Sequence, residues 1–540
     1  MNQVAILTGK KGAGLRKQSF FQGTLILIGA GILTRLLGFI PRIALPRIIG
    51  AEGVGLYTMA APTLYLMITL ATFGLNVAVS KVVAEAEARR DIARMQNTLR
   101  LSLAFVLVLS LAMMGLMIGL APLISRYLLT DPRSYYPLVG IAPILPIVAV
   151  SSVLRGYFQG RQNMVPTAMS SIAEAAFRIV AVLGLAWTFQ PYGVAYAAMG
   201  AMIGVVVGEF GSLCVLLLYV RRSLWHERFA WWNHTAKTMR RSWTLASDLS
   251  RVAVPVTASR LVGNAMYFIE PIAVTQSLAI AGIGTTVATS LYGQLEGMAI
   301  PLLLMPTAIT YSLSVSLVPA ISEAAAQGNY SLINRRLYQA LRLSIVIGGP
   351  CAVLLYVLAR PLCDLLWRAP EVGRLLEIMA PFSLFLYVQG PLSAALQGLD
   401  RAREAMRNSI IGAVVKTAAI FAFATQPRLG IDGVAIAINI GMVLVTLLHL
   451  SSLARTLSLT LALRDYGKTG LALLLMGYIA RYAYDAWFAG LSLGGRVFAT
   501  GALALLVYTV LLVWLRVLGR QDIQRIPWIG DVLAPYFPKR

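Results

Sequence analysis

The chain has 540 residues, of which 58% are hydrophobic and only 13% are charged, and its mean hydropathy is +0.74. Soluble domains carry about 25% charged residues, so this composition excludes a protein made of water-soluble domains. The 46 Lys and Arg residues against 22 Asp and Glu residues give a net charge of +24, an excess that the positions of these residues have to explain.

Long apolar stretches predict an all-α polytopic membrane protein, because a helix of about 20 residues crosses the hydrocarbon core of a bilayer. In chain order, the fourteen predicted spans are 22–49, 55–80, 101–121, 135–154, 166–189, 193–220, 252–279, 287–318, 339–359, 375–397, 409–425, 432–454, 469–489 and 496–515. Prolines within them, such as Pro41 and Pro46, are compatible with membrane helices whose freed carbonyls contact neighbouring helices or a water-filled cavity.

The positions of the cations predict the orientation of these spans. With the amino terminus inside, the inner segments hold 32 of the 46 cations, the outer segments eight and the spans six. Arg155 and Arg161 are counted here with the inner segment 155–161, and Arg342 with the inner segment 335–342. Because Lys and Arg are retained on the cytoplasmic side, both termini are predicted to be cytoplasmic. Most of the net charge then reflects topology and requires no nucleic-acid partner.

The longest inner segment, 221–251, combines cations with regularly spaced aromatic residues. Apolar residues recur at helical spacing from Trp225 to Trp243, and cations such as Arg228 and Lys237 lie largely on other faces. This pattern predicts an amphipathic helix in the membrane interface. The helix is either a cationic linker on anionic lipid headgroups or a regulatory docking site.

An internal repeat emerges when the chain is shifted against itself so that Gln159-Gly160 aligns with Gln397-Gly398. The same offset aligns Glu85-Ala86 with Glu323-Ala324. Parallel repeats place two bundles around a central cavity, related by an axis along the membrane normal. The predicted organisation is a cytoplasmic amino terminus (1–21), a six-helix N-lobe (22–220), a cytoplasmic amphipathic linker (221–251), a six-helix C-lobe (252–455), a final pair of spans (456–515) and a cytoplasmic tail (516–540).

The ionisable residues inside the spans are chiefly basic. Gly31, Arg35, Gly38 and Arg42 follow a spacing that places them on one face of the first span, with Pro41 as a potential kink. An ionisable side chain at membrane depth costs at least ~2.5 kcal/mol on insertion scales, and it usually faces a cavity or a partner. The first span is therefore predicted to present two arginines to such a cavity.

Further candidates lie in both halves of the chain. Arg178 and Lys416 are related by the repeat offset itself. Glu174 stands one turn before Arg178 and offers it an ion pair, whereas Lys416 has no acid at i−4 or i+4. The candidate substrate-binding residues are Arg35, Arg42, Arg178, Arg260, Asn264, Glu270 and Lys416, and Glu209 and Glu296 are acids that could neutralise part of the set.

A basic cavity at membrane depth suits an anionic solute, and the planar fork of arginine suits phosphate oxygens. An inside-negative potential favours the export of such an anion by ~2.3 kcal/mol per charge per 100 mV. The alternative is that these cations only pair with intramembrane acids and hold helices together. Scattered Cys and His residues, and the absence of hydrolase and nucleotide-binding motifs, predict no enzymatic reaction, no metal and no cofactor. The coupling ion, or the use of the membrane potential, stays open.

Several motifs resemble the stage V sporulation protein B family. They are Arg35-Leu36-Leu37-Gly38-Phe39, Gly50-Ala51-Glu52-Gly53-Val54-Gly55-Leu56-Tyr57, Leu291-Tyr292-Gly293-Gln294-Leu295 and Leu317-Val318-Pro319-Ala320. That family is part of the multidrug/oligosaccharidyl-lipid/polysaccharide (MOP) exporter superfamily, whose MurJ-type branch moves lipid-linked peptidoglycan precursors. The resemblance covers essentially the whole chain and implies a MATE/MurJ-like fold in a bacterial cytoplasmic membrane.

The resemblance also implies roles for individual residues. Arg35 matches a family arginine that helps to bind the diphosphate, and the final helix pair helps to shape a groove for the lipid tail. The chain departs from the better-known flippases at Gly293-Gln294, where they carry an Asp-Arg pair. Either Arg260 or Lys416 substitutes for the missing cation, or the substrate differs from lipid II.

The leading hypothesis is a flippase that moves an undecaprenyl-diphosphate-linked cell-wall precursor, for peptidoglycan or spore cortex, by alternating access. Its predicted partners are this lipid-linked oligosaccharide and the bilayer, with cell-wall synthesis proteins as further candidates. Three alternatives stay open: a cation-coupled multidrug exporter, a polysaccharide repeat-unit flippase and a non-transporting scaffold for envelope assembly. The drug exporter would favour intramembrane acids over arginines.

Overall fold

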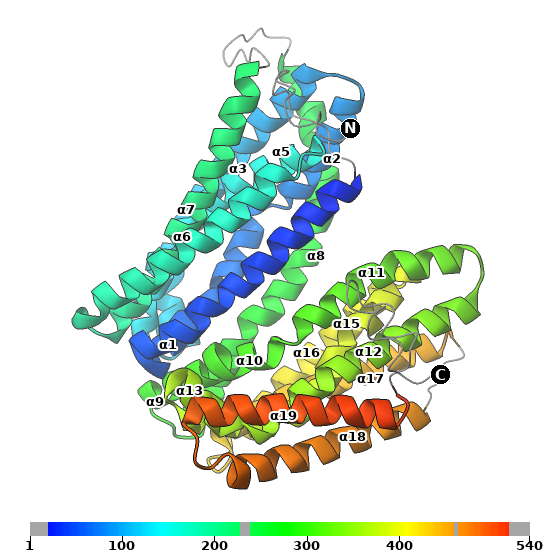
Figure 1. Cartoon of the computed structure of the whole chain (residues 1–540). Coiled ribbons are helices and arrows are strands. Elements are labelled where there is room, and N and C mark those ends of the chain that lie inside the picture. Colours follow the sequence, from blue (N-terminus) through cyan, green and yellow to red (C-terminus); the bar gives the residue numbers. More distant parts are fainter. Residues whose placement is uncertain (1–19, 227–237, 458–462, 518–540) are drawn as a thin grey trace, which may run out of the picture. The chain divides into compact units, whose positions relative to one another are not determined.

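The computed structural model describes residues 20–226, 238–457 and 463–517, and the regular structure within these ranges is entirely helical (Figure 1). The chain divides into two compact units, Met1–Pro271 and Ile272–Arg540. Residues 1–19 of the predicted amino-terminal segment, residues 227–237 of the predicted 221–251 linker and residues 518–540 of the predicted tail fall outside the described residues.

Eleven helical stretches in the described residues are long and apolar enough to cross a membrane. The first, Gly29–Ala88, has 60 residues and contains the second predicted span and all of the first except residues 22–28. The predicted eighth span falls on a series of shorter helices and the thirteenth on the helix Leu463–Tyr482, and neither is among the eleven. An all-helical polytopic membrane protein is therefore confirmed, and the number of fourteen crossings stays a prediction.

The first unit consists of long helices joined by short turns. They are α1 (Phe20–Thr72), α2 (Leu75–Ala88), α3 (Ile92–Leu123), α4 (Tyr135–Ile141), α5 (Ile144–Gly160), α6 (Val165–Phe189), α7 (Val194–His226) and α8 (Thr238–Ile280), which continues past the unit boundary. Short π or 3-10 segments follow α3 and α6, namely η1 (Ile124–Leu128), η2 (Pro132–Ser134) and η3 (Gln190–Tyr192). Val79, Leu99, Tyr157, Leu216 and Leu249 bring α2, α3, α5, α7 and α8 into one hydrophobic core.

Gly50 divides α1 into two helices. Its backbone has a φ of 71° and a ψ of 176°, whereas the helix continues through Pro41 and Pro46. Glycine adopts this conformation at little cost because it has no Cβ. The break in α1 thus lies at Gly50, eight residues after Arg42, and the kink that the sequence predicts at Pro41 stays a prediction.

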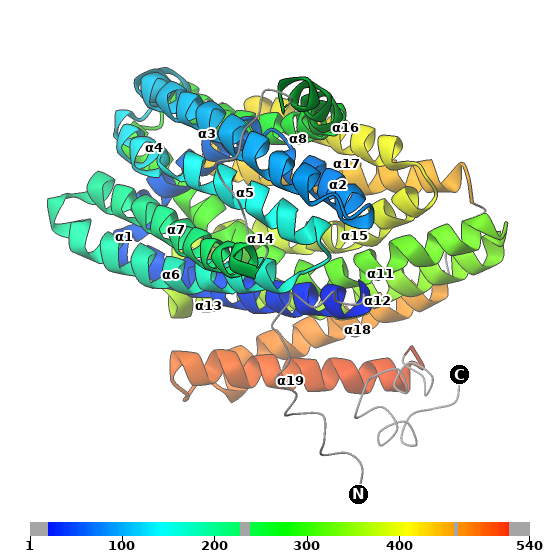
Figure 2. The same ribbon diagram turned by 90° about the horizontal axis from the view of Figure 1, so that it is seen from above.

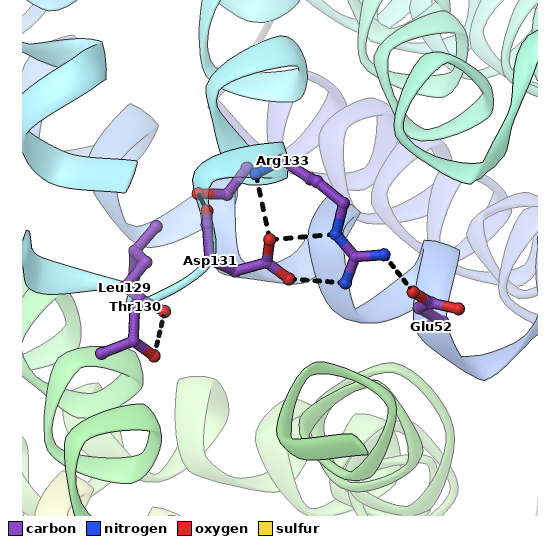
Figure 3. Close-up of polar contacts among 6 residues, drawn as sticks. Glu52, Leu129, Thr130, Asp131 and Arg133 are labelled. Atoms are coloured by element: carbon purple, nitrogen blue, oxygen red, sulfur yellow. Dashed lines mark hydrogen bonds and ion pairs between the residues drawn. The ribbon is translucent and has the colours of Figure 1, made fainter. Parts of the chain in front are cut away.

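Ion pairs of Arg133 with Glu52 and Asp131 hold the start of the second half of α1, just after Gly50. The guanidinium of Arg133 donates from Nε and Nη2 to the carboxylate of Asp131, at 3.1 and 2.8 Å, and its Nη1 contacts Glu52 (Figure 3). Asp131 is only 1% exposed at its side chain, and it also accepts from the Arg133 backbone N–H at 3.0 Å. Glu52 is thereby tied to the loop between α3 and α4.

The second unit has the same kind of architecture with more broken helices. Its elements are α9 (Thr285–Tyr292), the π-helix η4 (Gly293–Ala299), α10 (Ile300–Leu304), α11 (Thr307–Ala326), α12 (Tyr330–Val357), α13 (Ala359–Trp367), η5 (Pro370–Val372), α14 (Gly373–Met379), η6 (Ala380–Phe382), α15 (Ser383–Gly398), α16 (Ala402–Ala424), α17 (Gly430–Ala454), α18 (Leu463–Tyr482), η7 (Ala483–Trp487) and α19 (Leu493–Trp514). Ile321, Leu337, Leu396, Ala405 and Leu453 join α11, α12, α15, α16 and α17 in its main core.

Local features recur in the two units at the offset of the sequence repeat. Asp91 caps α3 by accepting from the Arg94 N–H at 2.8 Å, and Asn329 caps α12 by accepting from the Leu332 N–H at 3.0 Å. The same offset relates three pairs of residues with positive φ, Arg90 and Gly328, Thr130 and Arg368, and Gln162 and Asp400. These turns support the repeat, and the proposed lobe boundaries stay a prediction.

The repeat offset also relates two helix contacts made by glycine. A Cβ at Gly160 would lie 2.6 Å from the Ser80 carbonyl oxygen of α2, and a Cβ at Gly398 would lie 2.9 Å from the Val318 carbonyl oxygen of α11. Ser80 and Val318 are themselves equivalent positions of the repeat. In each unit, glycine thus lets two helix backbones approach more closely than any side chain would allow.

The terminal helices α18 and α19 lie side by side and pack on α12 (Figure 1 and Figure 2). Arg342 of α12, only 8% exposed, donates from Nη2 to the Val517 carbonyl at 2.8 Å. Lys468 of α18 donates to the Leu515 carbonyl at 2.9 Å. Two cations therefore satisfy carbonyls at the end of α19, where the helix dipole favours positive charge. Arg342, counted with the inner segment 335–342, thus has a buried packing role that its count as a topology marker does not include.

Replacing Arg342 by methionine should lower the free energy of unfolding by about 1.5–3 kcal/mol, because a hydrogen bond with a charged partner is lost. Thermal unfolding of the detergent-solubilised protein measures the effect. Arg335→Met is the matched control, since Arg335 is exposed on the same helix. Equal stability of the two variants would show that the Arg342 contact does not hold the terminal pair.

Candidate functional site

The first half of α1 presents the arginines that the sequence singles out. Arg35 and Arg42 are both exposed, and they lie within the membrane-spanning stretch Gly29–Ala88. The Arg42 guanidinium lies over the ring of Phe39, with 5.7 Å between the guanidinium carbon and the ring centroid. Because the helix is continuous from Phe20 to Ile49, Arg35 and Arg42, which are two turns apart, share one side of it.

Arg178 belongs to an ion-pair network that links α5, α6 and α7. Its Nη2 contacts Oε1 of Glu174, the residue one turn earlier, as the sequence predicts. The other oxygen of Glu174 lies 3.1 Å from Nη2 of Arg155, and the same nitrogen contacts Glu209 at 3.5 Å and Ser212 Oγ at 2.7 Å. The network therefore contains two guanidiniums and two carboxylates, with no net charge.

Arg155 is the residue of this network that the sequence analysis missed. It was counted with the inner segment 155–161, and the structure places it inside α5 with a side chain that is only 22% exposed. The acids that it contacts are 19 and 54 residues away in the chain. A local pattern around Arg155 gives no sign of partners at such separations.

A hydrophobic core joins α1 to the helices of this network. Ile49 of α1 and Val182 of α6 belong to it. Glycine on α7 allows α6 to approach closely, since a Cβ at Gly208 would lie 2.7 Å from the Cβ of Arg178. The part of α1 that follows Arg42 therefore packs beside the helices that carry the ion pairs.

The candidates on α8 have different environments. Arg260 is exposed and Glu270 is 8% exposed. The amide of Asn264 donates to Thr69 Oγ1 at 2.6 Å and to the Tyr65 carbonyl at 3.4 Å. Asn264 therefore connects α8 to α1. The sequence predicts a role for Asn264 in substrate binding and does not predict this contact between helices.

Lys416 lies in the second unit, at the position on α16 that corresponds to Arg178 on α6. Its aliphatic stem packs on α17, because a Cβ at Gly441 would lie 3.2 Å from the Lys416 Cβ. Two turns earlier, Asn408 donates to Ser452 Oγ at 2.9 Å and lies 3.2 Å from His449 Nδ1. The second unit thus has a buried neutral polar cluster on α16 and α17, where the first unit has ion pairs on α6 and α7.

An apolar groove of about 760 Å³ lies between α12, α15 and α18, within the second unit. Its apolar lining includes Val353, Tyr356, Leu384, Leu474 and Tyr478, and its charged lining residues are Glu377 and Arg481. Both charges have partners, since Glu377 pairs with Arg360 at 2.9 Å and Arg481 with Asp485 at 2.8 Å. The groove can therefore accept a hydrocarbon chain at little electrostatic cost.

Within the described residues, no group of three or more His, Cys, Asp or Glu side chains could hold a metal ion.

Comparison with known proteins decides the family. A model of the polysaccharide biosynthesis protein family matches residues 20–325, and the MatE model matches residues 271–422. The chain is 44% identical over 523 residues to stage V sporulation protein B of Bacillus subtilis (strain 168), with 96% of this chain and 100% of that protein covered. The chain belongs to the stage V sporulation protein B family.

Solved structures show the fold of this stage V sporulation protein B family member. An inward closed structure of the lipid II flippase MurJ superposes with a TM-score of 0.68 at 16% identity, covering 91% of this chain and 99% of that one. An inward-facing multidrug resistance MATE family transporter of the MOP superfamily superposes with a TM-score of 0.56 at 19% identity, covering 80% and 96%. The MurJ/MATE-like fold is thus confirmed. The protein is a membrane transporter of the MOP superfamily and not an enzyme.

Proposed function

We propose that this transporter is a flippase for an undecaprenyl-diphosphate-linked cell-wall precursor, used in peptidoglycan or spore cortex synthesis. In this proposal the chain crosses the bacterial cytoplasmic membrane fourteen times, with both termini in the cytoplasm. The N-lobe (22–220) and C-lobe (252–455) alternate access to a central cavity, and the final pair (456–515) contacts the lipid. The proposed substrate-binding residues are Arg35, Arg42, Arg178, Arg260, Asn264, Glu270 and Lys416.

The observation that carries the proposal is the exposure of Arg35, Arg42 and Arg260 on helices that are otherwise apolar. A cation at membrane depth is retained where it faces water, an acid or an anionic ligand. Arginine binds a diphosphate through paired, charge-assisted hydrogen bonds. Three such side chains therefore favour an anionic headgroup over the cationic drugs that an acid-lined exporter would select.

The groove beside α18 supports a lipid substrate in particular. A polyprenyl chain is hydrocarbon throughout, and each CH₂ group removed from water contributes about 0.8 kcal/mol. The groove offers a lining of Val, Leu and Tyr side chains over a volume of about 760 Å³. We infer that it receives the part of the prenyl chain that follows the diphosphate.

Reconstitution into liposomes tests the proposal. The purified protein should translocate an undecaprenyl-diphosphate-linked sugar, and Arg35→Ala should reduce the rate at least about tenfold, which corresponds to ~1.4 kcal/mol. Arg403→Ala is the control, because Arg403 is an exposed arginine at the start of α16. Unchanged transport by Arg35→Ala would remove Arg35 from the substrate site. Cation-dependent dye efflux without lipid translocation would support the multidrug exporter instead.

A further inference from the structure

The carboxylate of Glu174 is shared by two arginines. Oε1 contacts Arg178, and Oε2 lies 3.1 Å from Nη2 of Arg155. The Nε atoms of Arg155 and Arg178 are buried and have no hydrogen-bond partner among the described residues. Both guanidiniums therefore use only part of their donor capacity, since each has five N–H groups. In this structure, Glu174 is the anion that pairs with Arg178. A bound phosphate group could take the same place.

We propose that Glu174 is a displaceable counter-ion: when the diphosphate of the substrate binds Arg178, it replaces Glu174 there, and the released carboxylate takes up a proton. This inference rests on the proposed function and adds proton uptake to headgroup binding.

Exposure determines which member of the network an incoming anion can reach. The side chain of Arg178 is 39% exposed, against 17% for Glu174 and 6% for Glu209. The side chain of Arg155 is 22% exposed. Arg178 is thus the most accessible ion-pair member of the network, and an incoming diphosphate meets it before it meets either carboxylate.

The charge balance explains the proton. Glu174 contacts Arg155 of α5 and Arg178 of its own helix, and Arg155 also contacts Glu209 and Ser212 of α7. On α1, the hydroxyl of Tyr57 interacts electrostatically with Arg178. A diphosphate on Arg178 leaves two carboxylates to share Arg155. Like charges at short range disfavour the ionised form of one of them. Glu174 lies next to the bound diphosphate and has lost its contact with Arg178. It is therefore the carboxylate that takes up the proton.

The second unit lacks this carboxylate. Gly412 occupies the position of α16 that corresponds to Glu174, one turn before Lys416, and a Cβ there would meet the Val445 side chain of α17. Lys416 therefore has no acid at i−4 on its own helix. The displaceable counter-ion therefore belongs to the first unit.

Calorimetry in buffers of different ionisation enthalpy counts the protons exchanged on binding. The full chain in detergent is titrated with farnesyl diphosphate, a short prenyl diphosphate, at neutral pH. We expect the wild type to take up about one proton per ligand bound. Glu174→Gln should take up none and should bind about tenfold more tightly, because the competing carboxylate is gone.

Matched controls make the result specific. Glu404→Gln carries the same substitution at a surface pair, since Glu404 contacts Arg401 at 3.4 Å outside the network, and it should behave as the wild type. Farnesol, which lacks the anion, should give no proton uptake. Wild-type binding without proton uptake overturns the inference and leaves the proposed function intact. Absence of farnesyl diphosphate binding overturns both. The wild-type proton count keeps the test valid if Glu174→Gln fails to fold.

Discussion

Arg155→Met is expected to destabilise the protein by about 3–5 kcal/mol, the usual cost of removing one partner from a buried ion pair. The substitution keeps the length of the side chain and removes its charge. Glu209, whose side chain is 6% exposed, then loses its ion-pair partner, and Glu174 keeps only Arg178. Thermal or denaturant-induced unfolding in detergent measures the loss.

A surface ion pair provides the comparison. Arg481 contacts Asp485 at 2.8 Å, with side chains that are 65% and 50% exposed, and Arg481→Met should cost no more than about 1 kcal/mol. Adding Glu174→Gln and Glu209→Gln to Arg155→Met should restore much of the lost stability, because no unpaired carboxylate is left. A triple variant as unstable as Arg155→Met would show that packing of the arginine, rather than its charge, stabilises α5 against α6 and α7.

Gly160→Ala and Gly398→Ala should each destabilise the protein by about 1–3 kcal/mol, the range for forcing an extra group into a packed interior. At Gly160 the new methyl group would lie 2.6 Å from a backbone carbonyl and 2.8 Å from the Val83 Cβ. At Gly398 the shortest approach is 2.9 Å, so Gly160→Ala should have the larger effect. Unfolding midpoints of the purified variants give the order.

Gly184→Ala is the matched control for these two substitutions. Gly184 lies inside α6, and no heavy atom lies within 4 Å of a Cβ built there. Alanine should then stabilise the helix by roughly 0.5–1 kcal/mol. Loss of stability in Gly184→Ala comparable to that in Gly160→Ala would show that helix contact is not the reason for glycine at Gly160.

Much of the fold can be predicted from the sequence because a helix that crosses the bilayer needs about 20 consecutive, mostly apolar residues. Apolar stretches of sufficient length predict the helices, and the repeat offset predicts paired features such as the Asp91 and Asn329 caps. The break in α1 was harder to predict. Three prolines inside the helix are accommodated, and the chain bends at a glycine, because glycine alone tolerates that backbone conformation cheaply.

The candidate site was less predictable because its partners are distant in the chain. The Arg178–Glu174 contact is local and follows from helical spacing. Counting cations predicts topology and says nothing of burial, so it gives no sign that the side chains of Arg155 and Arg342 are largely buried. The groove draws its walls from residues as far apart as Ala352 and Arg481, and only the packing of α18 on α12 brings them together.

Because α1 is interrupted at Gly50, the helical segment before it can rotate about this residue as one rigid body. Arg42 lies about 12 Å and Arg35 about 22 Å from it along the helix, at 1.5 Å per residue. A rotation of about 10° at Gly50 would therefore move Arg42 by about 2 Å and Arg35 by about 4 Å. Glu52, just beyond the pivot and bound to Arg133, would stay in place. Because both arginines lie on the same helical segment, such a rotation would leave the distance between them unchanged and would alter only their distances from groups on other helices.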